Sequence, residues 1–137
     1  MGLACILHGQ TRWDNGGGTL LWSTANNWSP DGVPGNTVSL LFDSSFISTA
    51  QIISLGNNTR QMGAVTFAGI QNYTFNTGTF QVNNTGTNFT MNASGNVVIN
   101  SSFYVTKGWG MTGDGTGTVT LNGMLSDNGG TDALVKG

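Results

Sequence analysis

Six aspartates and one histidine are the side chains of this chain that could carry acid–base chemistry, and there is no glutamate. The aspartates are Asp14, Asp31, Asp43, Asp114, Asp127 and Asp132. A pair of carboxylates can hydrolyse a glycosidic bond, but most of these acids sit in Gly- and Asn-rich turns, where Asp is favoured by turn geometry alone. His8 is distant in sequence from every acid except Asp14, and no Gly-x-Ser-x-Gly elbow supplies a nucleophilic serine. We therefore expect no catalytic residues and no enzyme activity.

Metal and cofactor chemistry has few candidate ligands. One cysteine, Cys5, and one histidine do not make a zinc site, and we expect no cofactor. Asp114, Asp127 and Asp132 lie in Gly-rich segments and could offer oxygen ligands to calcium on flexible loops. The Gly-Gly-x-Gly-x-Asp repeat of calcium-binding β-rolls is absent. The sequence thus predicts no metal site, and these three acids are the calcium candidates should one exist.

The tryptophans are the other residues that could bind a ligand. Trp13, Trp22 and Trp28 cluster in the opening segment, and Trp109 lies between two glycines. Exposed aromatic rings in a row would form a sugar-binding platform, because a ring face packs on the apolar face of a pyranose. Alternatively, the first three could plug the end of a repetitive core, since stacked repeats need a capping layer. The sequence favours the cap for these three and exposure for Trp109, and all four remain the ligand-binding candidates.

A repeat of short strands must position these residues. Three- or four-residue alternating segments recur between Val65 and Leu121, each followed by a polar turn. They are Val65–Phe67, Tyr73–Phe75, Phe80–Val82, Phe89–Met91, Val97–Ile99, Phe103–Val105 and Val119–Leu121. Strands this short cannot bury a core alone, so neighbouring units must stack.

Three successive strands occupy 24 residues, from Val65 to Phe89, which suits one turn of a β-solenoid. A β-sandwich is the alternative, with turn signals every 8–12 residues or so. The very short strands, the scarcity of Asn-Gly hairpin signals and the Asn residues at strand ends, which solenoids stack into ladders, favour the solenoid. We expect an all-β, right-handed parallel β-helix with a Trp-rich N-terminal cap and almost no helix, because no segment shows a 3.6-residue period.

The chain divides into three zones by composition. Residues 1–12 form an apolar tail, which resembles the end of a secretory signal peptide or would otherwise be a frayed end or an apolar lid. Residues 13–137 are expected to form one solenoid domain, with residues 13–36 as the cap and residues 37–137 as the rungs.

Composition excludes two classes of partner. Charged residues make up 7% of the chain, against about 25% in an ordinary globular protein, so solubility must come from Asn, Thr, Ser and Gly. The net charge is −2 and the four basic residues are scattered, which excludes the basic face of a nucleic-acid binder. No segment approaches the 18 or so apolar residues of a membrane span.

The order of motifs resembles the autotransporter-associated β-strand repeat proteins, which are large bacterial secreted or surface proteins with β-helical passengers. The motifs that carry the likeness are Thr11-Arg12-Trp13-Asp14-Asn15-Gly16-Gly17-Gly18, Leu21-Trp22-Ser23, Ala25-Asn26-Asn27-Trp28-Ser29, Gly32-Val33-Pro34-Gly35, Ile53-Ser54-Leu55-Gly56, Gly63-Ala64-Val65-Thr66-Phe67 and the segment from Thr118 to Gly137. The likeness spans residues 11–137. Because the family continues with further repeats, the resemblance implies that this chain is an N-terminal fragment of a longer passenger.

These observations lead to two functional hypotheses. The first is a non-catalytic structural or adhesive module at the base of a passenger, secreted or displayed on a bacterial cell surface. The alternative is a carbohydrate-binding or weakly polysaccharide-active β-helix module, working through Trp13, Trp22, Trp28 or Trp109 with Asp14 or Asp114. The expected partners are a second copy of the chain, because the final rung would expose apolar residues such as Leu121, Leu125 and Leu134, and polysaccharide or other cell-surface components.

Overall fold

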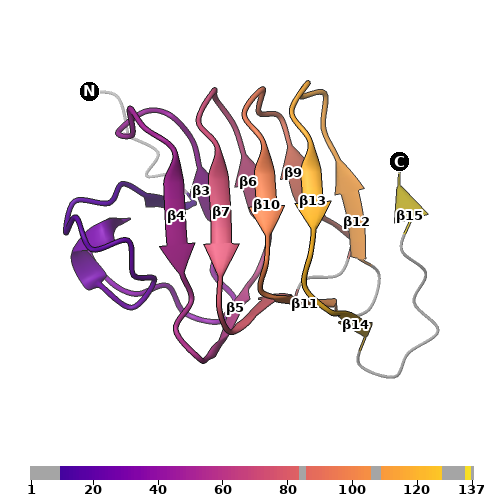
Figure 1. Ribbon diagram of the computed structural model, residues 1–137, viewed down its shortest axis with the longest axis horizontal. Coiled ribbons are helices and arrows are strands. Elements are labelled where there is room, and N and C mark those ends of the chain that lie inside the picture. The colour runs from indigo at the N-terminus through magenta and orange to yellow at the C-terminus, as the bar shows by residue number, and fades with distance from the viewer. Residues whose placement is uncertain (1–9, 84–85, 106–108, 128–134, 137) are drawn as a thin grey trace, which may run out of the picture.

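The chain folds as a right-handed parallel β-helix, shown in Figure 1 as a computed structural model. The structure describes residues 10–83, 86–105, 109–127 and 135–136. Four successive turns each contribute one strand to each of three sheets, and every pairing between turns is parallel. The expected all-β solenoid is thus confirmed, and the sandwich alternative is not adopted.

The three sheets, named A, B and C here, run along the rod and share its core. Sheet A contains β1 (Thr11–Trp13), β2 (Trp28–Ser29), β3 (Leu40–Phe42), β6 (Val65–Phe67), β9 (Gly86–Met91), β12 (Trp109–Thr112) and β15 (Val135–Lys136). Sheet B contains β4 (Gln51–Ser54), β7 (Tyr73–Asn76), β10 (Val97–Ile99) and β13 (Val119–Leu121). Sheet C contains β5 (Thr59–Met62), β8 (Thr79–Val82), β11 (Ser102–Val105) and β14 (Leu125–Asp127). Among the described residues the one helical segment is a single 3₁₀ turn, η1 (Ala25–Asn27), and no helix there is long and apolar enough to cross a membrane.

The core is built from columns of apolar side chains, because equivalent residues of successive turns lie in register. On sheet B, Ile53, Phe75 and Ile99 occupy one column and are fully buried. On sheet A, the rings of Phe42 and Phe67 stack with centroids 5.1 Å apart. Alternation along each strand therefore places one residue in the column and the next on the outer surface.

An asparagine ladder follows the end of sheet B. The side-chain amide of Asn100 donates to the Oδ1 atom of Asn76 at 2.8 Å, and that of Asn122 donates to the Oδ1 atom of Asn100 at 2.9 Å. Asn76 and Asn100 are among the strand-end residues for which the sequence predicted stacked polar side chains, and that prediction is confirmed for them. The ladder ties three turns together at one corner of the rod.

Glycines allow the turns between sheets A and B to lie directly on one another. A Cβ atom at Gly117 would collide with the backbone oxygen of Gly95, and one at Gly95 would collide with that of Gln71. Any larger residue at these two positions would push neighbouring turns apart. The glycine content of the chain is thus partly explained by backbone-to-backbone contact between turns.

The N-terminal cap occupies the first end of the rod. Strand β1 pairs in parallel with β3 and antiparallel with β2, and a single bridge joins Leu21 to Ser54 of sheet B. The cap strand begins at Thr11, so its first two residues fall in the segment that the sequence analysis assigned to the tail. The rest of that tail, residues 1–9, lies outside the described residues.

Candidate functional site

The three opening tryptophans form one aromatic cluster at the end of the core. Trp28 lies between the other two, with ring centroids 5.1 Å from Trp13 and 4.7 Å from Trp22 in edge-to-face geometry. All three contact the ring of Phe42 in the first turn, at 5.9 to 6.5 Å. Their exposures are 0% for Trp13, 1% for Trp22 and 0% for Trp28. They present no ring face to solvent and close the end of the apolar stack.

Hydrogen bonds engage the indole nitrogens of Trp13 and Trp28. The indole Nε1 of Trp13 donates to Oε1 of Gln51 at 3.1 Å, and that of Trp28 donates to the backbone oxygen of Trp22 at 2.9 Å. Buried Asn27 donates to the backbone oxygen of Leu21 at 2.9 Å and accepts from the backbone nitrogen of Gly17 at 3.0 Å. The cap is therefore a closed unit, and a sugar could reach these rings only if the cap opened.

The structure describes Trp109 and the calcium candidates only in part. Trp109 begins β12, and its side chain lies outside what the structure describes. Asp114 is exposed on the turn between sheets A and B, whereas Asp127 ends β14 in sheet C and Asp132 lies outside the described residues. No group of three or more potential metal ligands occurs in the described part of the chain.

Two of the remaining acids are engaged in local turns. The Oδ1 atom of Asp14 accepts from the backbone nitrogen of Gly16 at 2.9 Å. Asp43 accepts from the backbone and hydroxyl of Ser45 at 3.2 and 2.9 Å, and its carboxylate lies 3.3 Å from Nε of Arg12. These contacts are the turn-stabilising bonds that Asp makes by its short side chain. These contacts give both Asp14 and Asp43 a structural role.

Among the residues that the structure describes, Tyr73 has a clearly perturbed pKa. Its hydroxyl donates to the backbone oxygen of Asp43 at 2.6 Å. Burial of the phenol, and secondarily the nearby Asp43 carboxylate, raise the pKa of Tyr73 well above its usual value of 10.0. The group stays neutral at physiological pH, so it acts as a fixed hydrogen-bond donor between two turns and not as an acid or base.

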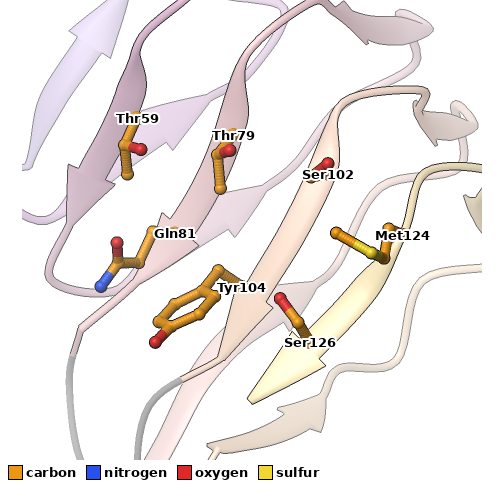
Figure 2. Close-up of a pocket in the computed structure, with 7 residues that line it drawn as sticks. All are labelled: Thr59, Thr79, Gln81, Ser102, Tyr104, Met124 and Ser126. Carbon is orange, nitrogen blue, oxygen red and sulfur yellow. The ribbon is translucent and has the colours of Figure 1, made fainter. Parts of the chain in front are cut away.

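The outer face of sheet C holds a shallow groove that the sequence analysis did not identify (Figure 2). We call it the sheet C groove. It has a volume of about 420 Å³ and is lined by Thr59, Thr79, Gln81, Ser102, Tyr104, Met124 and Ser126. Strand register arranges these residues in two columns, one through Thr79 and Ser102 and one through Gln81 and Tyr104. Three of the four turns therefore add two side chains each to the groove, and the first turn adds Thr59.

The polar groups of the groove are largely free of protein partners. Gln81 donates to Asn83 at 2.7 Å, and Asn83 donates to Gln61 at 2.8 Å, which fixes the amide side of the groove. Within the described part of the chain, the hydroxyls of Ser102 and Tyr104 make no side-chain hydrogen bond, and the same holds for Thr59, Thr79 and Ser126. The groove thus presents a row of hydroxyl donors and acceptors to solvent.

The groove could have been found from the sequence only through the register. Thr79 and Ser102, and Gln81 and Tyr104, are each 23 residues apart, close to the turn length that the sequence predicted. As isolated residues they have the appearance of an ordinary solvent face. It is their alignment that makes a continuous polar surface.

Comparison of the chain with known protein families, with curated proteins and with solved structures finds no match in any of the three.

Proposed function

We propose that this chain is a non-catalytic structural and adhesive module, secreted by or displayed on a bacterial cell and forming the base of a longer passenger-like rod. The observation that carries the proposal is the sheet C groove, an uncharged polar surface held on a capped, regularly stacked rod. A module of this kind holds a rigid surface away from the cell, and it acts by non-covalent binding to that surface.

The interior supports the mechanical part of this role. The core columns connect successive turns, and the asparagine ladder adds hydrogen bonds between three of them. Phe80 and Phe103, for example, stack 5.7 Å apart directly beneath the groove. A rigid support preorganises surface groups and lowers the entropy lost on binding.

The composition supports the adhesive part. A surface of hydroxyls and amides with 7% charged residues in the whole chain attracts neither nucleic acid nor an anionic membrane by long-range electrostatics. It is suited to short-range hydrogen bonding with neutral, hydroxyl-rich cell-surface components, namely polysaccharide.

A bead-retention assay tests this function. Beads carrying the purified chain are passed over immobilised bacterial envelope polysaccharide and over isolated cell envelopes, with Phe67→Asp as the unfolded control. Phe67 is fully buried and stacked against Phe42, so a carboxylate there should destroy the rod. We expect retention of the wild-type beads alone, and equal retention of both bead types would contradict an adhesive role for the folded surface.

We also propose that the 137-residue chain associates with a second copy of itself through the end opposite the cap. Strands β13 and β14 stand at the edges of their sheets in the described structure. Leu125 is 45% exposed and Met124 69% exposed, and the partly buried side chains of Val119 and Leu121 complete the apolar columns there. Another copy presents the same strand edges and the same apolar side chains, so two open ends related by a two-fold axis can cover one another.

A further inference from the structure

We infer that the sheet C groove binds a neutral glycan, with the ring of Tyr104 as its stacking platform and the hydroxyl columns as its hydrogen-bonding partners. This inference rests on the proposed adhesive function and names both the face and the ligand class. It replaces the opening tryptophans, which are buried, with a different aromatic side chain as the centre of binding.

Tyr104 is placed where its ring can stack on a sugar. The residue lies on β11, near the middle of the groove, with Gln81 on the preceding turn and Ser126 on the following one. Figure 2 shows its ring over the outer surface of the sheet between these two neighbours, and the side chain is only partly buried. An aromatic face in this setting packs on the apolar face of a pyranose, while polar neighbours bind the hydroxyl groups at the rim of the sugar.

The hydroxyl groups of the groove are available to bind a ligand. At the corner of sheet B, side chains such as Asn100 bond to the turns on either side. On the groove, the hydroxyls of Thr79, Ser102 and Ser126 have no such side-chain partner within the described residues. The asparagine ladder and the hydroxyl columns of the groove both repeat from turn to turn. The ladder side chains are bonded to each other, whereas the groove hydroxyls are available to a ligand.

The lining of the groove is uncharged, which bears on the charge of the ligand. None of its seven lining residues is an Asp, Glu, His, Lys or Arg. The nearest basic residue on these strands, Arg60, donates from Nε to the backbone oxygen of Leu55 at 2.8 Å, so it is occupied at the turn before β5. An anionic sugar would lose water around its carboxylate without gaining a cationic partner. The groove therefore favours a neutral glycan over a uronic-acid polymer.

The spacing of the groove side chains suits a sugar ring. Neighbouring strands lie about 4.8 Å apart, and two outward residues of one strand lie about 7 Å apart. This grid of hydroxyls has the scale of a single sugar ring. A linear glycan that runs along the rod can therefore place successive sugar units over successive turns, from β8 through β11 to β14.

Direct binding measurements test this inference. The probes are soluble neutral glucan, mannan and galactan, with polygalacturonate as the anionic comparison, titrated by calorimetry. Calorimetry is chosen over tryptophan fluorescence because the rings of Trp13, Trp22 and Trp28 are buried in the core. The variants are Tyr104→Ala and Tyr104→Phe, with Thr74→Ala on the outer face of sheet B as the matched control, and the melting temperature of each shows that it is folded.

We expect the wild-type chain to bind at least one neutral glycan more tightly than polygalacturonate. Loss of the ring in Tyr104→Ala should weaken that binding about tenfold or more. Tyr104→Phe, which keeps the ring, should stay within a few-fold of the wild type, and Thr74→Ala should not change.

Three results would overturn the inference. They are the absence of binding to every neutral glycan, tighter binding of polygalacturonate, and undiminished binding by folded Tyr104→Ala. If beads still adhere to cell envelopes in any of these cases, the chain is adhesive through a surface other than the sheet C groove, and the groove assignment fails. If adhesion is also absent, the proposed function fails with it.

Discussion

Removal of the Phe42 ring is the sharpest test of how the cap and the rod are joined. Phe42 is fully buried and contacts all three cap tryptophans on one side and Phe67, Tyr73 and Phe75 on the other, with the latter three ring centroids at 5.1 to 5.3 Å. Phe42→Ala therefore leaves a cavity at the junction of the two units. Large-to-small changes of this kind cost about 3–5 kcal/mol, a large part of the 5–15 kcal/mol or so that stabilises a typical domain.

Phe46→Ala supplies the matched control. It makes the same chemical change four residues away, at a ring that is 62% exposed and whose one described ring interaction is with the Arg12 guanidinium, 5.4 Å from its centroid. An exposed cation–π contact contributes about 0.5–1 kcal/mol. The two variants thus differ in burial and not in the atoms removed.

Urea unfolding followed by tryptophan emission measures both variants, because the buried indoles report on the cap. With a slope of about 1–3 kcal/mol per molar urea, Phe42→Ala should lower the midpoint on the order of 2 M and Phe46→Ala by well under 1 M. Phe42→Ala should also make the indoles accessible to acrylamide. If the alanine variant does not fold, Phe42→Leu should show a smaller loss of the same kind. Equal midpoints for the Phe42 and Phe46 variants would refute the idea that this ring joins cap and rod.

Three further predictions follow from single contacts. Asn100→Ala removes both ladder bonds of that residue and should lower the free energy of unfolding by about 1–2 kcal/mol in the same urea assay. An unchanged midpoint would show that the ladder does not contribute to stability. Because the folded state raises the pKa of Tyr73 above 10.0 by burial and the Asp43 carboxylate, the unfolded chain loses this proton first. Stability from this group is therefore complete below pH 10 and falls as pH rises above it; Tyr73→Phe should flatten that alkaline decline in thermal melts, and an identical decline in both proteins would contradict the assignment. Light scattering should give about twice the chain mass of 14.3 kDa for the wild type and a shift toward monomer for Leu125→Asp, and a wild-type monomer at high concentration would exclude self-association through this end.

The sequence identified the strands that alternate between apolar and polar residues, and it missed those that do not. Val65–Phe67 and Phe80–Val82 were predicted because every second residue is a large core side chain. Thr59–Met62 forms β5, although its sequence Thr-Arg-Gln-Met contains one apolar residue, because the strand is held by pairing with β8 in the next turn. Pairing with a neighbour can override a weak local pattern, and a single sequence does not display that neighbour.

The candidate site shows the same division. The sequence located the aromatic cluster in the opening segment and favoured its capping role, since three large rings beside a repetitive core need an apolar neighbour. It gave no indication of the groove, because residues such as Thr79 and Tyr104 acquire meaning only when the turns are aligned. Alignment depends on turn lengths that vary, as the 20-residue offset between Thr59 and Thr79 and the 24-residue offset between Tyr73 and Val97 show.

The pairing of β1 with β2 gives the rod a mechanical direction. It is the one antiparallel pairing among the described strands, and with the tryptophan cluster it anchors the first turn. The described strands at the opposite end, β13 to β15, pair with the preceding turn in parallel. Tension applied from that opposite end should therefore unfold the turns one at a time, and the capped first turn should unfold last. A turn of 24 residues, as between Tyr73 and Val97, would release about 80 Å of chain. A force–extension trace would then show one step per turn, with step lengths that follow the turn lengths, and the rod would absorb mechanical energy as it lengthens.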